Sequence, residues 1–262
     1  MGSTTEFGFG WLTPVLSYVM ACVGAGLGLR CMVRALGTTG RARTSWLVNG
    51  AIAIGTGIWT MHFIAMLGFS VTGTDIRYDV PLTVLSLVVA IVVVGIGVFV
   101  VGFSRSKTPA VLAGGVITGI GVAVMHYVGM SAMRMSGEIS YDPLTVALSV
   151  LIAVVAATAA LWATLTVRGP LAAFGASLVM GVAVSLMHYT GMAAVHVELH
   201  SGAHPMHSEL PGATPMSFIF PLTVLLGTYL FLSSAFVAIS PNVRGTNSHR
   251  ARPEREHQTT SG

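Results

Sequence analysis

Seven long apolar runs constrain this chain more than any other feature of its sequence. Each is long enough to cross a lipid bilayer, which takes about 20 residues of helix. Lipid cannot hydrogen-bond free backbone groups, so such segments must be helical. Only 8% of the residues are charged, against about 25% in soluble domains. The sequence therefore predicts an all-α membrane protein whose seven transmembrane helices lie near residues 11–33, 47–69, 80–103, 109–133, 143–166, 170–194 and 217–240.

The basic residues predict how these helices are oriented. Eleven of the thirteen Lys and Arg residues fall in the first, third and fifth connections or in the C-terminal tail, and only Arg77 and Arg134 fall on the other side. Basic residues next to transmembrane helices favour the cytoplasmic face. We therefore expect the N-terminus outside and the C-terminus in the cytoplasm. This placement also explains the net charge of +4, which indicates no nucleic-acid partner.

A six-residue pattern, Met-His-x-x-x-Met, occurs three times, near the C-terminal ends of the second, fourth and sixth runs. Leu82 lies 44 residues before His126, and Leu144 lies 44 residues before His188, so pairs of helices repeat with the same orientation. Three such parallel repeats around one axis would bring the histidines to one depth in the outer leaflet, and a seventh helix follows them. The three copies are residues 61–66, 125–130 and 187–192.

Each copy places an imidazole and a thioether on one helix face, since residues i and i+4 lie about 40° apart around a helix. Together these ligands suit copper, and thioether favours Cu(I). No carboxylate accompanies them in the membrane, so the pattern offers no oxygen cage for Mg²⁺ or Ca²⁺. The predicted metal ligands are His62, Met66, His126, Met130, His188 and Met192.

Five further side chains adjoin these ligands in the sequence. The methionine before each histidine points about 100° away from it and either surrounds the ligands or fills the core. The tyrosine after two of the histidines belongs to the membrane-interface belt or hydrogen-bonds a ligand or bound gas. These residues are Met61, Met125, Met187, Tyr127 and Tyr189.

The three copies resemble the MHYT domain, a bacterial integral-membrane sensory domain, over roughly residues 11–200. The second and third copies read Met-His-Tyr-x-Gly-Met, while the first has Phe63 and Ala65 in place of Tyr and Gly. The resemblance implies a multi-pass protein of the bacterial plasma membrane. It also implies that these residues bind copper and that the domain senses a diatomic gas such as O2, CO or NO.

A sensor of this kind needs an output domain or a signalling partner. MHYT relatives often carry GGDEF and EAL domains, or DNA-binding domains, after the membrane part. This chain ends about twenty residues after its last apolar run, so we expect a stand-alone member that signals through an unidentified partner. It shows no Ser/His/Asp set and no intramembrane carboxylate pair, so we expect no enzyme activity.

The segments outside the helices complete the predicted organisation. Residues 1–10 form a short outer N-terminus, 11–200 the MHYT domain, 201–216 an outer loop, 217–240 the seventh helix, and 241–262 a disordered tail held near anionic lipid by its arginines. Histidines and a methionine around the outer loop form either a metal-capture segment or an ordinary polar loop. These residues are His196, His200, His204, Met206 and His207.

Three alternatives to a copper sensor stay open at this point. A copper uptake or delivery protein would also use Met and His on several helices, but it needs further soft ligands toward the cytoplasm, where only Met180, Met32 and Cys31 occur. Haem b, the less favoured cofactor, could be held by two histidines or by His with Met. In a structural membrane protein, the histidines would only bridge helices.

Overall fold

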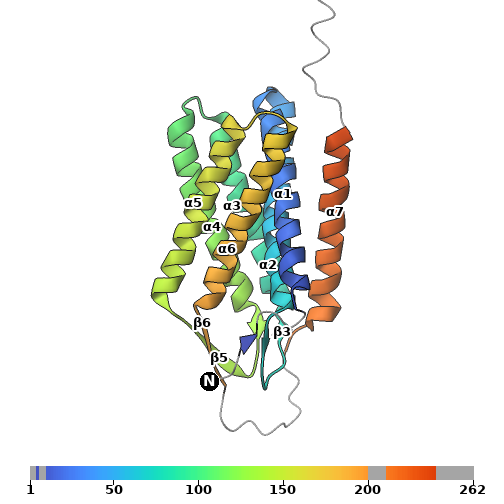
Figure 1. Ribbon diagram of the computed structural model, residues 1–262, viewed down its shortest axis with the longest axis vertical. Coiled ribbons are helices and arrows are strands. Elements are labelled where there is room, and N and C mark those ends of the chain that lie inside the picture. The colour runs from blue at the N-terminus through green and yellow to red at the C-terminus, as the bar shows by residue number, and fades with distance from the viewer. Residues whose placement is uncertain (1–3, 6–9, 200–210, 240–262) are drawn as a thin grey trace, which may run out of the picture.

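The computed structural model describes residues 4–5, 10–199 and 211–239, which form seven helices long and apolar enough to cross a membrane. The predicted fold class is therefore confirmed. The helices are α1 (Leu12–Leu36), α2 (Gly40–Leu67), α3 (Val80–Phe103), α4 (Lys107–Ser131), α5 (Pro143–Thr166), α6 (Pro170–Ala193) and α7 (Phe220–Ile239), with α7 preceded by the π-helical turn η1 (Pro215–Ile219). Figure 1 shows them as one upright bundle.

The predicted bounds hold closely for most helices, and α3 and α5 begin and end where expected. The exception is α2, which begins at Gly40, seven residues before the predicted start. Hydropathy detects only the apolar part of a helix. The helical hydrogen bonding of α2 begins earlier and includes the mostly polar segment 41–45. The first connection is therefore only three residues long.

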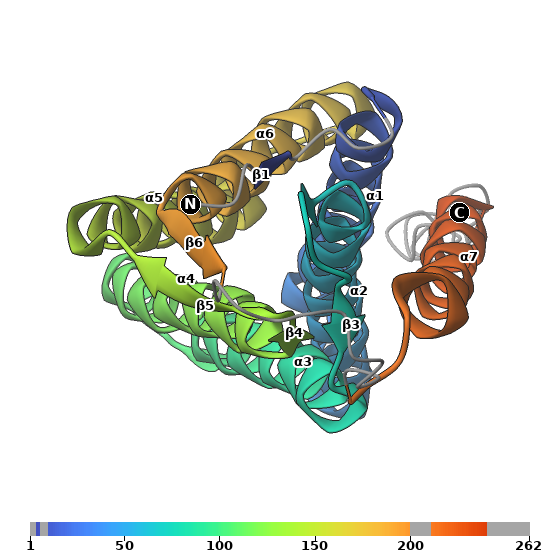
Figure 2. The same ribbon diagram turned by 90° about the horizontal axis from the view of Figure 1, so that it is seen from below.

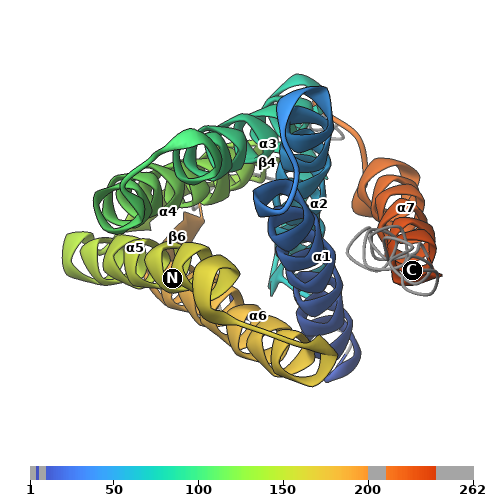
Figure 3. The ribbon, with the colours of Figure 1, turned by 90° about the horizontal axis from the view of Figure 1, so that it is seen from above.

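Three helix pairs form the sides of a triangle, which Figures 2 and 3 show from the two ends of the bundle. The pairs are α1 with α2, α3 with α4, and α5 with α6, and α6 packs back against α1 to close a six-helix ring. Helix α7 lies outside the ring, against α1 and α2. The parallel repeats predicted from the sequence thus become a threefold arrangement around one axis.

Short strands, which the sequence did not predict, cover the end of the ring where α2, α4 and α6 finish (Figure 1). They are β1 (Thr4–Thr5), β2 (Ser70–Val71), β3 (Arg77–Tyr78), β4 (Met133–Arg134), β5 (Gly137–Tyr141) and β6 (Val195–Leu199). In each repeat the strand before the first helix pairs with the strand after the second: β1 with β2, β3 with β4, and β5 with β6. The pairing satisfies backbone groups in connections that could not otherwise be buried over the ring.

The recurring Asp-Val-Pro-Leu-Thr and Asp-Pro-Leu-Thr segments have a local role at these helix starts. The carboxylate of Asp79 accepts a hydrogen bond from the Leu82 amide, and that of Asp142 accepts one from the Thr145 amide, so each caps its helix. The Leu82 amide, and then the Arg134 guanidinium, lower the pKa of Asp79. Hydrogen bonds from the Thr145 side chain and amide lower the pKa of Asp142. Both caps are therefore charged at neutral pH, which suits a helix N-terminus.

The arrangement sharpens the topology prediction. The α1–α2, α3–α4 and α5–α6 connections all lie at the end of the bundle opposite the strands, and they carry Arg41, Arg105 and Arg168 at or beside them. A cytoplasm-dependent reporter fused after Thr38 or Arg168 should be active, whereas the same reporter fused after Gly73 or Ser136 should be silent. The opposite pattern would place the strands in the cytoplasm and contradict the prediction.

Candidate metal centre

The three motif histidines, one each from α2, α4 and α6, meet on the axis of the ring. The Nδ1 atoms of His62 and His188 are 3.0 Å apart, those of His126 and His62 are 3.2 Å apart, and those of His188 and His126 are 3.3 Å apart. Each histidine is only 1% exposed. The three rings meet edge to face, so no single ring stacks on another. The predicted convergence of the repeats is thus present.

Hydrogen bonds alone cannot satisfy this triangle of nitrogens. Each Nδ1 is either a donor carrying a proton or an acceptor with a lone pair. Among three mutually touching atoms of two kinds, at least one pair is always alike, either two donors or two acceptors. Such a pair repels, and burial makes the repulsion costly. A cation that accepts all three lone pairs removes the conflict.

The size of the triangle also fits a metal ion. Its sides of 3.0–3.3 Å place the centre about 1.8 Å from each nitrogen (side divided by √3), close to the about 2.0 Å of a zinc–imidazole bond. Within the described residues this is the one cluster of three or more His, Cys, Asp or Glu side chains close enough to share an ion. Three neutral nitrogens with no carboxylate form a donor set for a late transition metal rather than a hard cation.

The motif glycines make the convergence sterically possible. A Cβ at Gly129 would lie 2.6 Å from Nε2 of His62, and one at Gly191 would lie 2.5 Å from Nε2 of His126. Each copy's glycine therefore lets the preceding copy's imidazole reach the axis. In the first copy Ala65 stands at the sequence position of these glycines, so the three copies are not equivalent there.

The motif methionines are all buried. Met66, Met130 and Met192 are 2%, 0% and 4% exposed. They lie one helical turn after the histidines, so each helix carries its imidazole and its thioether on one face. Met61, Met125 and Met187 are equally buried. Of these three, Met187 lines a pocket on the far side of the histidines from the strands.

Aromatic side chains connect two of the histidine-bearing helices, α2 and α4, to the next helix of the ring. The Tyr127 hydroxyl and the Ser149 hydroxyl on α5 form a hydrogen bond of 2.8 Å. In the first repeat, where Phe63 lacks a hydroxyl, the indole of Trp59 stacks beside Phe63 and donates to Ser86 on α3 instead. Sequence reasoning missed Trp59, although its place one turn before the Phe63 substitution was a usable signal.

The predicted capture segment is only partly described. His196 lies in β6 and is exposed, with Nδ1 3.2 Å from the Ala194 carbonyl oxygen. His200, His204, Met206 and His207 fall outside the described residues, as does the tail after residue 239.

Comparison with known proteins now identifies the family. The family model described as "MHYT: Bacterial signalling protein N terminal repeat" matches residues 55–115 and 119–177. The first match contains the first histidine motif and the second match contains the second. The chain belongs to the MHYT family. With its seven membrane-spanning helices, this MHYT chain is a multi-pass cell-membrane protein of a signalling family.

Curated relatives agree with this assignment. The chain is 41% identical over 190 residues to the bifunctional diguanylate cyclase/cyclic di-GMP phosphodiesterase MucR of Pseudomonas aeruginosa, covering 71% of this chain and 28% of MucR. It is 37% identical over 193 residues to the cyclic di-GMP phosphodiesterase NbdA of the same organism, covering 71% and 24%. The signaling protein YkoW of Bacillus subtilis is 29% identical over 236 residues, covering 84% and 28%. The chain thus spans about a quarter of each relative. No solved structure matches it.

The glycine contacts predict a first mutational result. Gly129→Ala should displace the His62 ring and lower the affinity for metal by about 10- to 100-fold, the range typical of residues that orient ligands. Gly175→Ala is the matched control, because a Cβ there, on the same kind of helix, meets nothing within 4 Å. Metal titration of both purified variants measures the difference, and equal affinities would show that the glycine contact does not position His62.

Proposed function

We propose that this MHYT protein is a membrane sensor whose three histidines bind copper, and whose metal responds to O2, CO or NO. The observation that carries the proposal is the buried triangle of Nδ1 atoms, 3.0–3.3 Å apart. The sensory role is supported by the signalling family. The gas is proposed from the resemblance to MHYT sensors.

Copper is favoured over other metals by the combination of ligands and burial. Zn²⁺ would accept three imidazoles but rarely uses a thioether, whereas Cu(I) uses both. Cu(I) also carries a single charge, which matters at histidines that are 1% exposed, because burying a charge is costly. A haem macrocycle would need an open slot between its axial ligands, and these imidazoles are in mutual contact, so we do not propose haem.

Copper delivery is a second candidate with one observation in its favour. Met187, Met180 and Met32 all line the pocket that continues from the histidines along the bundle axis. A transfer path for Cu(I) needs two or three soft ligands at each stop, and here the methionines lie singly among apolar side chains. We therefore rank delivery below sensing.

A sensor must also connect its site to an output, and α7 is the helix through which the chain leaves the bundle. The ring of Phe63 lies 4.7 Å from that of His62 and 5.9 Å from that of Tyr78. The Tyr78 amide donates to the Ala213 carbonyl over 2.8 Å, and the Ala213 amide donates to the Tyr78 carbonyl over 2.9 Å. Buried Tyr78 therefore links the metal centre to the segment that starts η1 and α7, and we include this link in the proposal.

Copper binding itself gives the central test. His126→Ala and His188→Ala should each sharply lower the copper bound per purified protein, because two imidazoles cannot replace three. Met130→Leu and Met192→Leu should weaken Cu(I) more than Cu(II), because the lost ligand is soft. Elemental analysis together with Cu(I) and Cu(II) competition titrations measures both effects.

Two exposed residues supply the controls for that test. His196→Ala and Met216→Leu remove the same side chains from exposed positions and should leave the final copper content unchanged. Full copper occupancy in a folded His62/His126/His188 triple-alanine protein would refute the copper assignment.

The link to α7 gives a separate test. Gly212 has φ +121° and a Cβ there would lie 2.7 Å from the Tyr78 carbonyl oxygen, so Gly212→Ala should break the Tyr78–Ala213 pairing. Copper should still bind, but copper-dependent hydrogen-exchange protection at η1 and α7 should vanish. Gly40→Ala, also at positive φ but with nothing within 4 Å of the new Cβ, is the control and should keep that protection. Unchanged copper-dependent hydrogen-exchange protection in Gly212→Ala would show that the Tyr78–Ala213 pairing does not connect the copper site to α7.

A further inference from the structure

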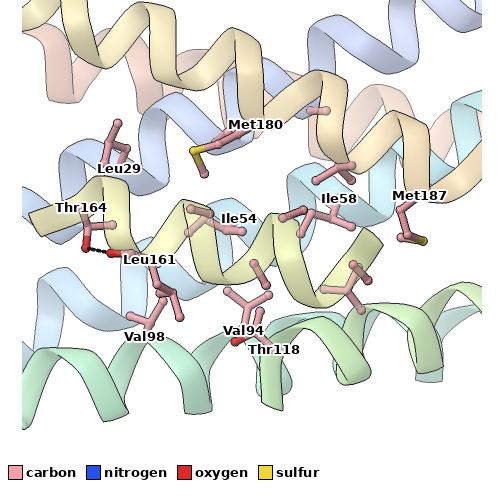
Figure 4. A pocket seen from close by; sticks show the side chains of 18 of the residues that line it. Leu29, Ile54, Ile58, Val94, Val98, Thr118, Leu161, Thr164, Met180 and Met187 are labelled. Carbon is pink, nitrogen blue, oxygen red and sulfur yellow. Dashed lines mark hydrogen bonds between the residues drawn. The ribbon is translucent and has the colours of Figure 1, made fainter. Parts of the chain in front are cut away.

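An apolar pocket of about 60 Å³ lies on the axis of the ring, on the side of the histidines away from the strands. All six ring helices contribute to its wall. In Figure 4, Met187, the residue before His188, lies at one end of the pocket, and Leu29 and Thr164 lie at the opposite end. The pocket therefore continues from the metal centre into the middle of the bundle.

The threefold arrangement fixes where this pocket begins. Ile58, Val122 and Val184 each lie four residues, one helical turn, before a motif histidine, and all three line the pocket. The residues eight positions before the histidines line it too, namely Ile54, Thr118 and Met180. The pocket thus begins one helical turn beneath the three imidazoles and continues past the second.

Small side chains leave this space unfilled. Helix α5 directs four alanines to the pocket at the spacing of one helix face, Ala153, Ala156, Ala157 and Ala160. Empty volume weakens packing, and a leucine at such a position would be an ordinary choice in a membrane helix. The lining chemistry excludes water as the occupant. Thr118 and Thr164 are the polar residues among the lining, and the Thr164 hydroxyl already donates to the Leu161 carbonyl. The Thr118 hydroxyl, which has no hydrogen-bond partner, leaves one side-chain partner, whereas a buried water needs two to four.

We propose that this axial pocket is a binding site for one small apolar molecule, of the class that includes O2, NO, CO and xenon. One water-sized probe needs about 10–15 Å³, and a cavity of about 150 Å³ accepts benzene, so a pocket of about 60 Å³ suits a guest of very few heavy atoms. The near end of the pocket lies one helical turn from the imidazoles. The relevance of this pocket to sensing rests on the proposed function. The binding of a small apolar guest in the pocket does not depend on that function.

Xenon tests the site without any metal. In metal-free protein carrying ¹³C-methyl methionine, xenon should cause saturable shifts of the Met180 and Met187 methyl signals. The methyl of Met135, which lies between β4 and β5 and not in the axial pocket, should shift only in proportion to dissolved xenon. Ala157→Leu adds three carbons to the pocket and should abolish the saturable shifts. Ala159→Leu places the same side chain on the exposed face of α5 and should leave them unchanged.

The outcomes separate this proposal from the copper assignment. Copper content should be the same in wild type, Ala157→Leu and Ala159→Leu, so loss of xenon binding and loss of copper are independent results. If Ala157→Leu does not fold, Ala160→Val fills the same pocket with two carbons. Shifts at Met180 that are proportional to xenon rather than saturable would overturn the proposal. Saturable shifts that persist in the Ala157→Leu variant would also overturn it. Copper-specific anomalous density at Met180 would also overturn it and would favour copper delivery.

Discussion

The mutual contact of three imidazole nitrogens on the bundle axis is the constraint on which the rest of this structure depends. Nitrogens 3.0–3.3 Å apart require the backbones of α2, α4 and α6 to approach the axis closely. Two glycines leave room for this approach, Gly129 beside the ring of His62 and Gly191 beside that of His126. Three touching nitrogens of two kinds cannot all be satisfied by hydrogen bonds among themselves, so the arrangement suits a bound cation.

The three repeats share this geometry but are not equivalent. The first copy carries Phe63 and Ala65, so it lacks the tyrosine hydroxyl and the open glycine of the other two. Trp59 replaces the missing hydrogen bond to the next helix through Ser86. Phe63 instead contacts Tyr78, which pairs with Ala213 at the start of the segment leading to α7. The departure from the motif therefore occurs in the repeat that α7 packs against.

Much of the fold could be predicted because the bilayer restricts it so strongly. Seven helices, their order and the parallel repeat follow from apolar runs and from equal spacing between Leu82–His126 and Leu144–His188. The start of α2 was wrong because its first turns are polar, and hydropathy does not register a polar helix end. The strand pairs over the ring were missed because their segments are short and their partners lie more than 50 residues apart in the sequence. Local pattern carries no signal for such pairing.

The sequence by itself determined which residues could form a site. A histidine with a methionine four residues later, on three membrane helices, is visible in the chain, because helix periodicity fixes which side chains share a face. Only the tertiary structure decided that the three Nδ1 atoms touch, that glycines face the neighbouring copy's ring, that His196 lies in a strand, and that alanines of α5 leave a pocket beneath the site. These features are distances between helices, and they depend on how six helices close into a ring. The spacing of residues along the sequence does not specify such distances.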